Sequence, residues 1–302
     1  MAGWDPSELP PIAAARLARF AESRVSSSLL SVPGSVALEA YGFDAVGEAM
    51  GAIVESIGWS GYGGCGYGYG GFGGLAGRFG AGTVTSGQGG FAGYAPYVEA
   101  LYRGWDTAIH RMLIEARAMG ADGVVGVRLD RRDLGESTHE FLALGTAMRA
   151  RGSIHPTTPF STELSGPDVA VALAAGWVPV TIAMGITVAI RHDDYQTQTQ
   201  ASSMWSGNTE VSGYTELVTY ARDDARRQFT HRAARAGAEA LLVSRHSLEI
   251  HEVELAENHR DHIAEAMFTG TAMARFHQGA VAPTSTLTIL PLTRASDRRI
   301  RL

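Results

Sequence analysis

Two stretches of the chain show a helical pattern of apolar residues followed by two strand patterns. Between Asp106 and Met119 the apolar residues recur at helical spacing, at Ile109, Met112, Leu113 and Ala116. Gly120 stands where helices commonly end in glycine, and the β-branched valines that follow it predict a strand. The chain then turns over 133–137 and returns over 140–148. This pattern predicts a helix followed by a two-stranded hairpin.

The same succession recurs in the second half of the chain. Matching blocks occur in the same order in both halves, at 42–51 and 176–185, at 120–121 and 237–238, and at 145–148 and 270–273. The last block reads Gly-Thr-Ala-Met in both. The Gly-Ala blocks lie 117 residues apart and the Gly-Thr-Ala-Met blocks lie 125 apart, so we expect a longer connecting loop in the second hairpin. Together the blocks predict an α+β protein with a tandem duplication of a β-α-β-β unit.

The duplication predicts two domains with short flanking segments. We expect an N-terminal arm over 1–28, a first domain over 29–152, a linker over 153–166, a second domain over 167–277 and a C-terminal tail over 278–302. The expected helices cover 12–24, 97–119, 167–175 and 212–236, and the strand-like segments cover 35–41, 45–54, 123–151, 176–191, 241–254, 262–276 and 284–292. Residues 192–209 are polar and are expected to form a loop. The helix of the arm is interpreted either as a docking arm or as a terminal helix on its own domain.

A glycine- and aromatic-rich insert over 58–93 interrupts the first domain. It holds 17 of the 37 glycines and shows no helical or strand period. Glycine makes a backbone costly to order, so this insert is either a flexible loop or a segment that packs between subunits. It lacks the Gly-Lys-Ser/Thr ending of a phosphate-binding loop, so it does not indicate nucleotide binding.

Composition narrows the class of protein. The chain of 302 residues has a formal net charge of −6, which argues against a nucleic-acid surface. Its single cysteine, Cys65, excludes an intrachain disulfide and suits a cytoplasmic location. No apolar run reaches the roughly 18 residues of a membrane helix, and the N-terminus does not read as a secretory signal.

The block MLIEARAMGADGVVGVRLD at 112–130, with EFLALGTAMRA at 140–150, resembles the YbjQ-like heavy-metal-binding domain family. That family shows an A-x-x-x-G-A-[ND]-x-[VI]-[VI]-G-[VI] run and a closing G-T-A-[VM]. The second half keeps the Gly-Ala and Gly-Thr-Ala-Met blocks but departs over 239–244. The resemblance covers about 30–150 and 167–276, less the insert. It implies one helix on a small antiparallel sheet, assembled into rings that are typically pentamers.

The family's label directs attention to metal ligands. His259 and His262 have a spacing suited to a shared divalent metal if that segment is helical, and His251 and Glu252 lie close by in the sequence. The alternative is that these are surface and interface histidines, since the first half has only His139 in the corresponding region. A lone cysteine cannot build a thiolate site within one chain, although five copies of Cys65 around a ring axis could.

Catalytic motifs are absent from the sequence. It contains no G-x-S-x-G, H-E-x-x-H or phosphate-binding loop. Glu140 and Glu265 recur at matched positions, as do Arg128 and Arg245, and one cross-strand ion pair in each half would explain both repeats. The alternative is a duplicated general acid, which would require a closed polar pocket around Glu140 or Glu265.

These observations favour a non-enzymatic, cytoplasmic protein that assembles with itself into a ring or shell-like scaffold, with pentamers as the expected unit and a protein cargo as a possible partner. A small three-stranded sheet leaves strand edges open, and such a sheet gains by pairing with a neighbour. The alternative function is metal or small-ligand binding at inter-subunit or histidine-rich sites, and an enzyme is the third. No cofactor is expected apart from a possible divalent metal.

Overall fold

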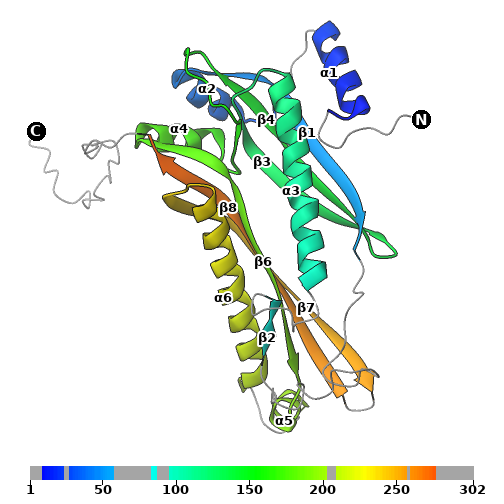
Figure 1. Ribbon diagram of the computed structural model, residues 1–302. Helices are drawn as coiled ribbons and strands as arrows, with labels where there is room; N and C mark the ends of the chain where they lie inside the picture. Colours follow the sequence, from blue (N-terminus) through cyan, green and yellow to red (C-terminus); the bar gives the residue numbers. More distant parts are fainter. Residues whose placement is uncertain are drawn as a thin grey trace, which may run out of the picture.

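The computed structural model describes residues 9–23, 27–57, 83–86, 95–202, 209–256 and 259–276. Within them it has two four-stranded sheets, each carrying one long helix on a face, and a short helix of each half packs against that of the other at one end of the molecule (Figure 1). The predicted α+β class, with a helix on a small antiparallel sheet, is confirmed. No described helix combines the length and the apolar character that a membrane span requires.

The first half contains α2 (Val32–Ala40), β1 (Phe43–Ser56), α3 (Ala95–Ala118), β3 (Gly123–Gly135) and β4 (Thr138–Ala150). Its sheet has the order β1-β4-β3-β5, in which β5 (Phe160–Ser161) comes from the expected linker and runs parallel to β3. The helix α1 (Pro11–Ser23) lies beside α3 and β1 (Figure 1).

The second half contains α4 (Gly166–Ala174), β6 (Trp177–His192), α5 (Tyr195–Ser202), α6 (Ser212–Arg235), β7 (Ala240–Ala256) and β8 (His259–Arg275). Its sheet has the order β2-β6-β8-β7, in which β2 (Val84–Thr85) comes from the insert in the first half. Apart from α5, the order of elements repeats that of the first half, and β-α-β-β is common to both. The origin of this repeat by duplication stays a prediction.

The helix α3 builds the main core and reaches both halves. Its buried face includes Trp105 and Met112, and the indole of Trp105 meets the ring of Phe141 on β4 edge-on at 5.1 Å between ring centres. The same hydrophobic cluster contains Ile186 and Ile190 of β6. The two sheets are therefore joined through a shared apolar core.

The glycines that the sequence placed after the two long helices have the expected conformation. Gly120 and Gly237 have φ angles of +73° and +80°, which favour glycine. The backbone N–H groups at both positions bond to carbonyls of the last helical turn, which ends α3 and α6 there.

Three sequence predictions were wrong. Residues 35–41 belong largely to helix α2, because the Ser31 side chain caps Gly34 N at 3.2 Å and Pro33 lies in the first turn. Residues 195–202 form helix α5 instead of a loop. The eight extra residues of the second hairpin lengthen its strands to 17 residues each, against 13 in the first, instead of lengthening its loop.

The expected strand over 284–292, residue Cys65 and most of the insert lie outside the described residues.

Candidate functional site

The outer edges of the sheets are the first place to look for an assembly surface, because an unpaired strand edge offers a row of free N–H and C=O groups. The edge of β1 is closed by side chains from α3. The Glu115 carboxylate accepts a hydrogen bond from Met50 N at 2.7 Å, and the Arg111 guanidinium donates to the Ala52 carbonyl at 2.6 Å. Two side chains of α3 thus occupy the middle of this edge.

The edge of β6 is also closed. The Tyr102 hydroxyl accepts from Ile186 N at 2.7 Å, and the Ser86 hydroxyl accepts from Val188 N at 3.0 Å. The strand β2 pairs with β6 at Ala189 and Ile190. Both Tyr102 and Ser86 come from the first half of the chain, so this edge is covered by the neighbouring domain.

The edge of β3 is covered by the segment that joins the halves. After β5, Thr162 and Leu164 accept hydrogen bonds through their carbonyls from Val127 N and Gly126 N, at 2.9 and 3.0 Å. Further along β3, the Arg245 guanidinium of β7 donates to the Leu129 carbonyl at 3.4 Å. The linker is therefore built into the first sheet.

The edge of β7 is different. No described side chain from Ala240 to Val253 is buried, whereas the facing residues of β8 are almost all buried. Leu242, Val243 and Ile250 are 44%, 57% and 49% exposed. Within the described residues, the backbone of this strand has ladder hydrogen bonds only to β8. We call this surface, over 240–253, the β7 edge, and it is the candidate assembly site.

A polar cluster joins the two halves beside this edge. The buried Glu265 of β8 accepts hydrogen bonds from the Tyr97 hydroxyl at 2.7 Å and from the Arg131 guanidinium at 2.8 Å. Burial, together with the negative charge of Glu265, raises the pKa of Tyr97, so the phenol stays a hydrogen-bond donor at neutral pH. Arg131 also reaches Glu249 of β7 at 3.4 Å. This cluster fixes the orientation of one sheet against the other.

The predicted ion pairs within each half were wrong. Glu265 pairs with Arg131 of the other half, and Arg245 contacts the Leu129 carbonyl instead. In the first half, Glu140 lies opposite Arg132 and Arg128 lies opposite Leu144. The repeated carboxylates therefore do not have equivalent partners.

Replacing Tyr97 with phenylalanine should lower the free energy of unfolding by about 1–2 kcal/mol, because the change removes the neutral donor to a buried carboxylate. Urea unfolding followed by circular dichroism measures this loss. Tyr41→Phe is the matched control, since Tyr41 is about half exposed. Equal stability of the two variants would contradict a stabilising role for the Tyr97 hydroxyl.

Of the residues that the sequence suggested as metal ligands, the structure brings Glu252 and His262 together and turns His251 to the other face. Glu252 lies opposite His262 in the β7–β8 ladder, with 3.8 Å between Oε2 and Nε2. His251 is the neighbour of Glu252 on the strand and so points to the other face, where its Nε2 lies 3.9 Å from Glu249. His259 is on β8, not on a helix, and its side chain lies outside the described residues. No group of three suitable ligands occurs among the described residues.

His262 instead belongs to a buried cluster at the end of the second sheet. Its Nδ1 lies 3.0 Å from Asp193, which also accepts from the Tyr214 hydroxyl at 3.1 Å. Burial beside Asp193 raises the pKa of Tyr214 to about 12. Asp193 could not be recognised as a partner from local sequence, because it lies 69 residues from His262.

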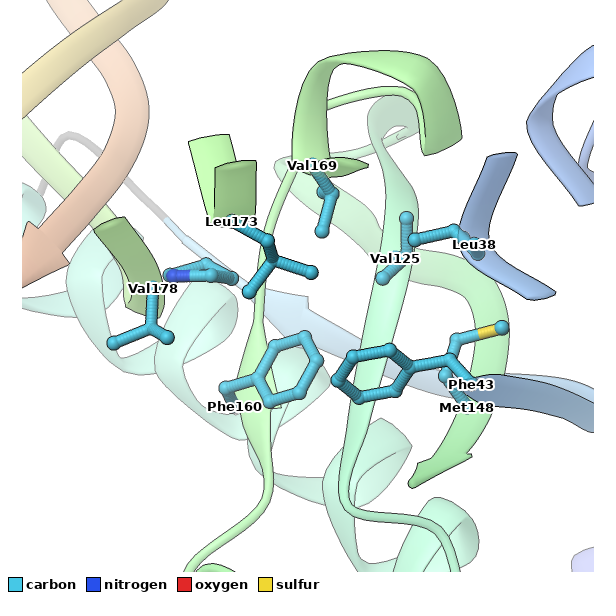
Figure 2. A pocket seen from close by; sticks show the side chains of 9 residues that line it. Leu38, Phe43, Val125, Met148, Phe160, Val169, Leu173 and Val178 are labelled. Atoms are coloured by element: carbon cyan, nitrogen blue, oxygen red, sulfur yellow. The ribbon is translucent and has the colours of Figure 1, made fainter. Parts of the chain in front are cut away.

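An apolar cavity of about 50 Å³ lies between the two halves (Figure 2). Phe43 and Phe160 meet edge-on at 6.5 Å between ring centres, and Leu173 and Val178 face them from the second half. All nine lining residues are apolar, so this cavity lacks the carboxylate that the enzyme hypothesis requires. It is also far smaller than the roughly 150 Å³ of a cavity that holds benzene.

Comparison with known proteins agrees with this architecture. Residues 81–151 match the YbjQ family model, described as "Putative heavy-metal-binding", which confirms the resemblance for the first half. A UPF0145 protein of Halorubrum lacusprofundi is 46% identical over 55 residues, and one of Methanocella arvoryzae is 38% identical over 68 residues. These alignments cover 18% and 22% of this chain and 53% of each relative, so the chain matches about half the length of these proteins.

A longer match covers both halves. The encapsulin nanocompartment protein Rv1762c of Mycobacterium tuberculosis is 31% identical over 260 residues, which are 82% of this chain and 88% of that protein. An alignment of this length includes elements of both sheets and not only the YbjQ-like region. The chain therefore belongs to the family of the encapsulin nanocompartment protein Rv1762c.

Proposed function

We propose that this protein is a non-enzymatic scaffold that assembles with itself into a closed, shell-like particle. The observation that carries the proposal is the similarity, over 82% of the chain, to a protein named as a nanocompartment protein. By the same similarity we propose a cytoplasmic location and a protein cargo. The pentamer, expected from the YbjQ resemblance, is the proposed ring unit.

The β7 edge supports assembly on physical grounds. A 17-residue strand with an unpaired edge and half-exposed Leu242, Val243 and Ile250 is an aggregation hazard in a monomer. Soluble proteins usually protect such edges, as β1 and β6 are protected here by side chains. An edge left open next to two closed ones is best explained by a partner that covers it.

We also propose that the chain consists of two duplicated domains, over 29–152 and 167–277, with an arm, a linker and a tail. The common order β-α-β-β supports this division. The insert over 58–93 and the arm are the segments by which the first domain differs from the second, and we propose that they adjust contacts between subunits.

Native mass spectrometry with negative-stain electron microscopy should detect one large closed species, with the same mass before and after a chelator. The chelator treatment distinguishes the alternative function. Metal binding would instead give a mass excess of one metal per chain that disappears after chelator treatment. If the double variant His259→Ala with His262→Ala also lacked this excess, the result would favour a metal site made of those residues with His251 and Glu252. A clean monomer at micromolar concentration would contradict assembly altogether.

A further inference from the structure

We propose that β7 pairs with β7 of a second copy of this chain, antiparallel and about a two-fold axis. This inference rests on the proposed self-assembly and names the surface that forms one of its contacts. Two observations support the pairing: β7 is an open strand edge, and the charged residues along β7 are arranged in a particular order.

In the described part of the chain, β7 is the one long edge strand whose backbone bonds only to its ladder partner. A ring or helix of chains joined through their sheets needs two different open edges in each subunit, because the contact is head-to-tail. Here β1 is closed by Glu115 and Arg111, and β6 is closed by Tyr102, Ser86 and β2. A subunit that has one open strand edge can pair that edge only with the same edge of another subunit. Such a contact has two-fold symmetry.

The charges along β7 select the antiparallel direction. The strand carries Arg245 and His246 in its first half and Glu249 and Glu252 in its second half. Antiparallel pairing places the basic part of one copy beside the acidic part of the other, whereas parallel pairing in register places like charges together. Glu249 and Glu252 each have an arginine at 3.4 Å, yet their side chains remain 54% and 49% exposed. They are therefore still available to a second chain.

The apolar side chains fit the same contact. Val243 and Leu242 lie near the start of β7 and Ile250 lies past its middle, all about half exposed. A second strand at the usual spacing of about 4.8 Å would cover part of each of them. It would also satisfy the outward N–H and C=O groups of the strand.

A single-cysteine scan tests this pairing. In a Cys65→Ser background, each position from 242 to 252 is changed to cysteine in turn, and the assembled protein is oxidised and separated on a non-reducing gel. A disulfide needs Cα atoms about 4.4–6.8 Å apart, and residues directly opposite in an antiparallel ladder are about 4.5–5.5 Å apart. Covalent dimer should therefore form efficiently only at the one or two positions next to the two-fold axis.

Val54→Cys in the same background is the matched control, because Val54 is 55% exposed on the closed strand β1 and should stay uncross-linked. Particles that assemble normally but form no dimer from any β7 position would overturn the β7 pairing and leave the proposed assembly standing. Dimer at every position, or equally at Val54, would also overturn it, because random collision would explain that result. A chain that never assembles would contradict both proposals.

Discussion

Changing Gly185 to alanine should lower the free energy of unfolding by about 3 kcal/mol, the upper end of what overpacking a core usually costs. A Cβ atom at this position would lie 2.0 Å from the Ala225 carbonyl oxygen and 2.4 Å from Phe229 N. Both atoms are backbone atoms of α6, so no side-chain rotation can relieve the clash. The helix must move away from β6, and its packing against the sheet is lost.

The corresponding change in the first half should have a similar effect. A Cβ atom on Gly51 would lie 2.0 Å from the Ala108 carbonyl oxygen and 2.4 Å from Met112 N, both in α3. Thermal unfolding measured by calorimetry checks both variants. Gly152→Ala is the control, since nothing lies within 4 Å of a Cβ atom there. If Gly51→Ala and Gly185→Ala melted at the temperature of Gly152→Ala, the close helix–strand contact would be wrong.

These glycines show what local sequence can predict. Glycine inside a strand commonly marks a bulge or a close backbone contact, and here the ladder between β1 and β4 shifts register between Ala45 and Gly47 while Gly51 lies against α3. The long helices were predicted within two residues at either end, because their apolar spacing and the terminal glycines are local signals. Residues 35–41 were predicted to be a strand because of their apolar content, whereas the capping side chain of Ser31 starts a helix there.

The candidate site could be predicted only in part. A small sheet with open edges follows from the sequence pattern, but which edge stays open depends on side chains distant in the sequence. Met50 N is satisfied by a carboxylate 65 residues away, and Ile186 N by a hydroxyl 84 residues away. The same holds for Glu265, whose partner Arg131 lies in the other half. No periodicity or motif in the sequence predicts contacts between residues so far apart in the chain.

The last prediction concerns helix α1, which contacts α3 through an ion pair. None of its residues belongs to a described hydrophobic cluster, and only Ala13 among its described residues is buried. Arg16, however, forms a bidentate ion pair with Glu115, whose side chain is fully buried. Removing one partner of such a pair leaves a buried charge without compensation, which costs about 3–5 kcal/mol.

Arg16→Ala should therefore lower the free energy of unfolding by about 3 kcal/mol, measured by urea unfolding. Arg19→Ala is the control, because Arg19 is exposed on the same helix. Glu115→Gln added to Arg16→Ala should recover much of the loss, since an amide oxygen can still accept from Met50 N without a buried charge. Equal stability of Arg16→Ala and Arg19→Ala, or no recovery in the double variant, would contradict this account.

The same variant should disturb assembly as well as stability. If Glu115 without Arg16 turns toward water, Met50 N on β1 loses its acceptor and a second strand edge opens. A chain with two open edges can form head-to-tail contacts, which do not have to close. Arg16→Ala particles should therefore be heterogeneous in size by native mass spectrometry, and the double variant should be more uniform. Uniform particles from Arg16→Ala would show that the β1 edge stays closed without this ion pair.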